Sequence, residues 1–155
     1  MLSDVRSNCE MKYLSIFAAA LLLFSCSNPK AKEAPEQDNE VIVRTVVSEM
    51  QSSLPQKLGN GFVLAKMYLK SNHVVYEYEI DENIINISAS FMNEARMKEE
   101  ILASMRKMPE ADQKSFKEFL LAIRQTGRDL VYLYVGNKTH TEWRIVFSKE
   151  ELEKM

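Results

Sequence analysis

An uncharged apolar run near the start of the chain, residues 13–24, limits what the remaining residues can become. Lys12 precedes the run and the small residue Ser25 follows it. A helix needs about 20 apolar residues to span a bilayer, so this run is too short for a stop-transfer helix and fits the apolar core of a secretory signal peptide. Asp4 and Glu10 do not suit the positive region that precedes such a core, so Met11 is expected to be the true start.

The apolar run closes on Leu23-Phe24-Ser25-Cys26: an aliphatic residue, a middle residue, a small residue and a cysteine. This stretch resembles the lipobox of bacterial lipoprotein precursors, although Phe24 is bulkier than the family's usual residue. The resemblance implies that residues 1–25 are removed and that Cys26 becomes a lipidated N-terminus carrying acyl chains such as palmitate. It also implies a lipid anchor in the bacterial cell envelope. The expected location is the outer membrane, with the protein facing the periplasm.

Residues 27–40 are polar, contain two prolines and have no apolar side chain larger than that of alanine. Such a segment cannot bury enough surface to order itself. With Cys26 it is expected to form a flexible tether with an end-to-end distance of about 20 Å. Residues 41–155 are then expected to form a single globular domain.

Both cysteines, Cys9 and Cys26, lie outside this domain, so core burial has to hold it without a disulfide. The formal net charge of the chain is −2, and it is unchanged by removal of residues 1–25, which takes away two acidic and two basic residues. Lysine and glutamate are interspersed, without the clustered positive surface that nucleic acids need. We therefore expect no nucleic-acid partner.

Apolar periodicity predicts an α+β fold for residues 41–155. Helical spacing occurs in residues 41–54, 88–108 and 110–126, and strand patterns in residues 62–70, 73–80, 130–135 and 140–147. Short turns join the strands into two β-hairpins, and Ser148 with Glu151 forms a capping box that opens a short C-terminal helix. We predict an antiparallel sheet of four or five strands packed against two or three helices. Residues 84–87 are a candidate fifth strand, and the second and third helices are expected to pair as an αα-hairpin.

A Val-Tyr-x-Tyr pattern occurs twice, at residues 75–78 and 131–134, each time in a predicted strand. An internal repeat, in which each half of the domain consists of a helix followed by a β-hairpin, would explain the two occurrences. Chance would also explain them, because valine and tyrosine both favour strands.

The candidate surface of the domain consists of aromatic and acidic side chains on these strands. The four tyrosines, which would form either a stacking platform or core residues with a wet hydroxyl, are Tyr76, Tyr78, Tyr132 and Tyr134. Glu77 and Glu79 share a strand face, and Glu142 can approach them if the hairpins pair. Carboxylate pairs perform acid/base chemistry when burial separates their pKa values, whereas exposed glutamates mainly solvate a strand.

Histidine and methionine are two further residue types that can bind metals. His73 and His140 follow predicted turns, and two histidines without cysteine do not make a zinc site, so no metal and no cofactor is expected. The methionines of the second predicted helix suit core filling, an adaptable groove or soft-metal binding, in that order of preference: Met92, Met97, Met105 and Met108.

With an anchor, a tether and no assembled catalytic set, the sequence favours a membrane-anchored binding or scaffolding module with a protein or envelope-polymer partner. Two alternatives stay open: a small envelope hydrolase that uses Glu77, Glu79 or Glu142, and a lipoprotein that inhibits a hydrolase. In the last strand, Trp143 is predicted to be largely buried and Arg144 to point the other way.

Overall fold

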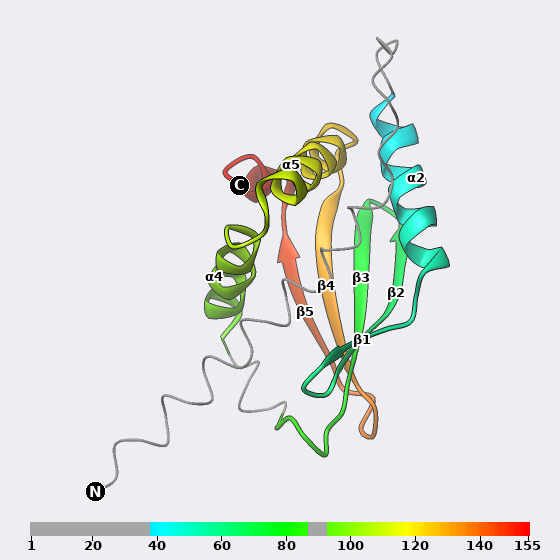
Figure 1. Ribbon diagram of the computed structural model, residues 1–155, viewed down its shortest axis with the longest axis vertical. Coiled ribbons are helices and arrows are strands. Elements are labelled where there is room, and N and C mark those ends of the chain that lie inside the picture. The colour runs from blue at the N-terminus through cyan, green and yellow to red at the C-terminus, as the bar shows by residue number, and fades with distance from the viewer. Residues whose placement is uncertain (1–37, 87–92) are drawn as a thin grey trace, which may run out of the picture.

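A computed structural model describes residues 38–86 and 93–155. The strands form one sheet in the order β1-β2-β3-β4-β5 (Figure 1). In chain order the elements are α2 (Asn39–Ser52), β1 (Gln56–Gly59), β2 (Phe62–Lys70), β3 (His73–Ile80), α4 (Glu94–Met105), α5 (Glu110–Gln125), β4 (Asp129–Gly136), β5 (Glu142–Phe147) and α6 (Lys149–Leu152). The predicted α+β class, with two hairpins, helices and a short C-terminal helix, is confirmed. In the described ranges, no helix is long and apolar enough to cross a membrane.

One pairing of the sheet differs from the sequence prediction, which had every neighbouring pair antiparallel. The pairs β1–β2, β2–β3 and β4–β5 are antiparallel, but β3 and β4 run parallel in unbroken register from His73↔Asp129 to Ile80↔Gly136. A parallel pair needs a long crossover connection. Here α4 and α5 lie between the two strands in sequence and return the chain to the end of the sheet where β3 began.

Helix α2 begins where the polar sequence gives way to apolar spacing. The side chain of its N-cap, Asp38, accepts a hydrogen bond from the Glu40 amide at 3.0 Å. Buried Val43, Val47 and Met50 recur at helical intervals and face the sheet. Glu40 also receives two hydrogen bonds from the Arg128 guanidinium, at 2.5 and 3.1 Å. These bonds fix the start of α2 beside the start of β4.

Helices α4 and α5 bury different kinds of side chain. The N-cap of α4 is Asn93; the predicted caps Ser88 and Ser90, like Met92, lie outside the described residues. Met97, Met105 and Met108 are buried, so core filling is confirmed for these methionines. Helix α5 buries the predicted stripe of Phe116, Phe119, Leu120 and Ile123.

Two local predictions are wrong. Helices α4 and α5 do not pack as an αα-hairpin: α5 packs against α2 and α6, α4 packs against β5, and Figure 1 shows α4 and α5 meeting at an angle. Residues 84–86 form no strand, and Ile87 lies outside the described residues. The amides of Ile84 and Ile85 both donate to the Asp81 carbonyl, which closes a turn and buries Ile85. The fifth strand is instead β1, which ends in the tight turn Asn60-Gly61.

The two faces of the sheet have different surroundings. The main core cluster joins residues of α2, α4, α5 and α6 to one face, which we call the covered face; its strand residues include Leu64, Val74, Tyr76, Tyr78, Leu130, Tyr132, Tyr134, Ile145 and Phe147. A second, smaller cluster contains strand residues alone and marks the opposite face, which we call the open face: Val75, Val131 and Leu133, with Tyr68, Val135 and Val146 packed against them.

Candidate functional site

The open face carries an apolar strip that crosses four strands. In the strand register, Tyr68 lies opposite Val75, Val75 beside Val131, and Val131 opposite Val146. Leu133 and Val135 continue the strip along β4. These six side chains form a groove together with polar residues of the same strands and of the β2–β3 turn: Lys70, Ser71, His73, Glu77, Glu142 and Arg144. The groove therefore has an apolar centre and a charged rim.

The centre of the strip is nearly inaccessible to water although no helix of the described residues packs on it. Val75 is 5% exposed, Val131 6% and Leu133 7%. Their short side chains lie on the middle strands and are shielded by longer neighbours on the same face, such as Tyr68. The strip therefore forms the apolar floor of the groove, and longer polar side chains line its rim.

The two carboxylates on the rim are held in local ion pairs. Lys66 Nζ lies 2.8 Å from Glu77 Oε1, and the Tyr68 hydroxyl donates to Glu77 Oε2 at 3.1 Å. Partial burial, with this hydrogen bond and the negative charge of Glu77, raises the pKa of Tyr68. At the other side of the groove, the Arg144 guanidinium lies 2.8 Å from Glu142. Each carboxylate in the groove thus has a cation partner.

The three glutamates of the predicted site lie on the open side of the sheet, but they do not share one pocket. Glu77 and Glu142 line the groove, whereas Glu79 is exposed and lies beyond its lining. In the strand register, Val135 separates Glu79 from Glu142. Ion-paired carboxylates across a shallow sheet face suit the binding of a partner better than acid/base catalysis.

The four tyrosines of the predicted site lie in the core instead of on a surface. Tyr76 stacks on Tyr132 at 5.4 Å between ring centroids, and Tyr78 stacks on Tyr134 at 5.1 Å, because the two Val-Tyr-x-Tyr segments are in register in the parallel pair. Burial raises the pKa of all four hydroxyls. Strand alternation places these rings on the covered face and the valines and glutamates on the open face.

The two histidines and two residues of the last strand, Trp143 and Arg144, differ in their position relative to the groove. His73 lies at the end of the groove with Nε2 3.7 Å from Asp129, while His140 lies in the β4–β5 turn with a positive φ of 53°. In residues 38–86 and 93–155, no three metal-ligating side chains of the His, Cys, Asp or Glu type come together. Trp143 lies on the covered side as predicted, but it is half-buried, while Arg144 points to the open face as predicted.

The apolar floor of this site was not singled out from the sequence. Residues 130–135 form an uninterrupted apolar run, and such a run indicates a strand with apolar side chains on both faces. Compared with β3, the run has Leu133 where β3 has Glu77, and Val135 where β3 has Glu79. That comparison between the two similar segments would have located the strip.

No protein-family model matches this sequence, and no curated protein matches it either. Two solved structures match this chain. A Pseudomonas aeruginosa protein proposed to be secreted, PA3611, shares 12% identity with a TM-score of 0.54, over 77% of this chain and 98% of that chain. The Vibrio vulnificus pilotin of the type 2 secretion system, EpsS, shares 10% identity with a TM-score of 0.48, over 76% of this chain and 94% of that chain. The first similarity shows a shared fold.

Proposed function

We propose that this chain is a membrane-anchored binding module of the bacterial envelope, which holds a protein partner against the open face of its sheet. The observation that carries the proposal is the apolar strip of the open face, whose accessible part is formed by the half-buried Tyr68, Val135 and Val146 and which no helix of the described residues covers. An apolar centre inside a polar rim is the usual anatomy of a protein–protein interface. Glu77 and Glu142 on the rim already have ion-pair partners within the chain. These charges can orient a bound protein without being buried alone.

A protein partner is favoured over an envelope polysaccharide by the side chains on this face. Sugar rings are commonly stacked on exposed aromatic side chains, and Tyr68 is the single aromatic residue that lines the groove. The other floor residues are aliphatic and suit an aliphatic side chain. An inhibitor lipoprotein would use this same face, with a hydrolase as its partner.

The hydrolase alternative has one observation in its favour, since Glu77 and Glu142 do line one groove. Both carboxylates are ion-paired, and the groove lies on an open sheet face. Binding is therefore the better supported function.

The membrane part of the proposal depends on residues 11–26. Lipidation of Cys26 and release of residues 1–25 would leave residues 26–40 as the tether and residues 41–155 as the binding domain. The Pseudomonas protein of the same fold is proposed to be secreted, which agrees with export. Metabolic labelling with an alkyne fatty acid tests the anchor: the wild-type chain should be labelled and Cys26→Ser should not. Equal labelling of the two chains would refute lipidation at Cys26.

The open face can be tested by placing a photo-crosslinking amino acid at single positions in living cells. Val135 and Val146 are half-buried positions on the open face, and Leu121 is an exposed apolar residue of α5 that serves as the matched control. We expect one discrete adduct from each open-face position and none from Leu121. Val146→Glu should reduce the adduct formed from position 135 by about tenfold, because it places an unpaired charge in the apolar contact.

Folding of the crosslinking variants is checked by the circular dichroism of the purified chains. Equal adducts from positions 121 and 135, or an adduct from position 135 that Val146→Glu leaves unchanged, would contradict binding at the open face.

A further inference from the structure

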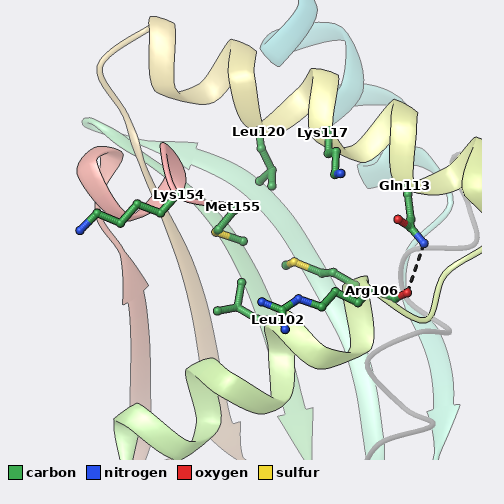
Figure 2. A pocket seen from close by; sticks show the side chains of 8 residues that line it. Leu102, Arg106, Gln113, Lys117, Leu120, Lys154 and Met155 are labelled. Atoms are coloured by element: carbon green, nitrogen blue, oxygen red, sulfur yellow. Dashed lines mark hydrogen bonds between the residues drawn. The ribbon is translucent and has the colours of Figure 1, made fainter.

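A second recess lies on the other side of the molecule, between α4, α5 and the residues that follow α6. Figure 2 shows it from close by, and its volume is about 170 Å³. Its lining has an apolar part and a cationic part from three separate segments: Leu102, Met105, Arg106, Gln113, Lys117, Leu120, Lys154 and Met155. The recess shares no residue with the groove of the open face.

The apolar part forms the floor. Met105 and Leu120 are buried, and Leu102 and Met155 are half-buried at the edges. Methionine side chains adapt their shape to what they contact. An apolar cavity of roughly 150 Å³ in a protein core admits benzene, so this floor has room for a short length of one hydrocarbon chain. It is too small for the two acyl chains of a phospholipid.

The cationic part forms the rim. Arg106 and Lys117 are exposed, and Figure 2 shows both reaching into the space between α4 and α5, with Lys154 pointing outward at the edge. No carboxylate side chain lines the recess. Among the ion pairs of the described residues, none involves these three cations. On α5 the positions three and four residues from Lys117 are Gln113, Lys114, Leu120 and Leu121, so its helix face offers no acidic partner.

The geometry around the rim is held in place by hydrogen bonds. The Gln113 amide nitrogen donates to the carbonyls of Met108 at 2.7 Å and Arg106 at 3.2 Å, which braces the turn between α4 and α5. Glu151 accepts hydrogen bonds from Lys98 Nζ at 2.9 and 3.1 Å, and these bonds are the main cause of its lowered pKa. The charge of Lys154 lowers the pKa of Glu151 further. Arg106 and Lys117, which have no carboxylate partner among the described residues, are therefore available to an anionic ligand.

The recess lies at the end of the domain where the tether joins. Glu40 in the first turn of α2 is bound to Arg128, and the next residue, Asp129, accepts a hydrogen bond from the first amide of α6 at 3.0 Å. The start of α2 and the segment carrying Lys154 and Met155 are thus at the same end of the sheet. In a lipid-anchored chain the tether joins the domain at this end and keeps the recess within about 20 Å plus the width of the domain from the membrane; this step of the inference rests on the proposed function.

We infer that this recess binds a fatty acid: one hydrocarbon chain over Met105, Leu120 and Met155, and a carboxylate against Arg106 and Lys117. The volume of about 170 Å³ has room for part of one hydrocarbon chain, and the cations of the rim favour a negative head group. The position of the recess near the tether gives access to molecules that leave the membrane. Charge and shape thus both match a single-chain carboxylate.

Photo-crosslinking with a diazirine fatty acid tests this inference on the full chain in phosphatidylcholine vesicles. We expect labelled peptides from the ends of α4 and α5 and from the C-terminal segment, with labelling abolished by excess decanoate and retained in excess decanol. Arg106→Gln combined with Lys117→Gln should lower the labelling about tenfold, because two surface ion pairs are lost. Lys114→Gln, an exposed lysine of the same helix outside the lining, is the matched control and should leave labelling unchanged.

Three results would overturn the inference: labelling spread over the whole surface, equal competition by decanol and decanoate, or equal losses in the double variant and the control. A thermal midpoint equal to that of the wild type shows that the double variant is folded. Phosphatidylglycerol added to the vesicles should not compete; competition by this lipid instead of decanoate would assign the rim to a phospholipid head group and refute the fatty acid. Flotation of the vesicles reports the lipid anchor separately, so a chain that floats without being labelled refutes the recess alone.

Discussion

Val131 and Tyr132 are neighbours in β4 with similarly low exposure, 6% and 3%, yet they are buried in different ways. Tyr132 lies under the helices and stacks on Tyr76 and Tyr78 of the adjacent strand. Val131 lies on the open face between Val75 and Val146 and is shielded by side chains of the sheet. Low exposure on the covered face reflects a second layer of structure, while on the open face it reflects short side chains between longer ones. On the open face, the apolar side chains that solvent reaches are therefore those at the edge of the strip, such as Val135 and Val146.

The largest contrast between the faces is expected in alkaline solution. Burial raises the pKa of the four stacked tyrosines above their ordinary value of 10.0, so the folded chain keeps protons that the unfolded chain loses above that pH. The free energy of unfolding is insensitive to these groups below about pH 10 and falls by roughly 5 kcal/mol for each pH unit above it, if four protons are released on unfolding. Tyrosinate absorbance at 295 nm should rise together with the loss of circular dichroism.

Tyr68 provides the comparison from the open face. Its pKa is raised less strongly, by partial burial and the hydrogen bond to Glu77, so it should ionise in the folded chain at a lower pH than the stacked rings. Tyr68→Phe should reduce this early rise and leave the cooperative one in place. A single gradual titration of all the tyrosines near pH 10 would show that the stacked rings are not buried.

The second contrast is a pair of substitutions in neighbouring residues. Tyr132→Ala should lower the free energy of unfolding by about 3 to 5 kcal/mol, because it leaves a cavity beneath the helices. Val131→Ala should cost about 1 to 2 kcal/mol, since it removes two methyl groups from a surface with no second layer. Urea denaturation measures both values.

Tyr76→Phe is the control for the rings of the covered face. It removes a buried hydroxyl that has no hydrogen-bond partner in the described residues, so the free energy of unfolding should change by less than about 1 kcal/mol. Equal losses for Tyr132→Ala and Val131→Ala would mean that the two faces are covered alike, contrary to the structure.

The smallest effect is expected for the charges on the open face. The Lys66 side chain is 59% exposed, and exposed ion pairs contribute little to stability, so Lys66→Ala should shift the free energy of unfolding by no more than about 0.5 kcal/mol. A loss above about 1 kcal/mol in urea denaturation would show that the Lys66–Glu77 pair holds the sheet together. In that case the rim would have a structural role in addition to any contact with a partner.

The local elements could be predicted from the sequence because their causes are local. Strand alternation in residues 73–80 and the two-residue turn before it determine the β2–β3 hairpin, and Ser148 with Glu151 determines the start of α6. The direction of the β3–β4 pairing has no such local cause. It depends on how α4 and α5 cross the covered face, which is decided by the packing of Phe116, Phe119 and Ile123.

The candidate site could be predicted only in part, for a related reason. Alternation shows that Tyr76 and Glu77 point to opposite faces, but it does not show which face the helices cover. The glutamates lie on the open face, whereas the four tyrosines that are candidates for a surface lie in the core. The strip of valines depends on Val75, Val131 and Val146 meeting across three strands, through the parallel register of β3 with β4 and the antiparallel register of β4 with β5.

The bond between Glu40 and Arg128 has a mechanical consequence. A pull on the chain from its N-terminal side reaches the domain at Asp38 and loads the first turn of α2. This helix rests on the covered face, where it packs against β2 and α5, and it is not a strand of the sheet. Tension applied at Asp38 therefore loads the contacts of α2 with β2 and α5 before it loads the pairing of the strands, and we expect the helical layer to yield first.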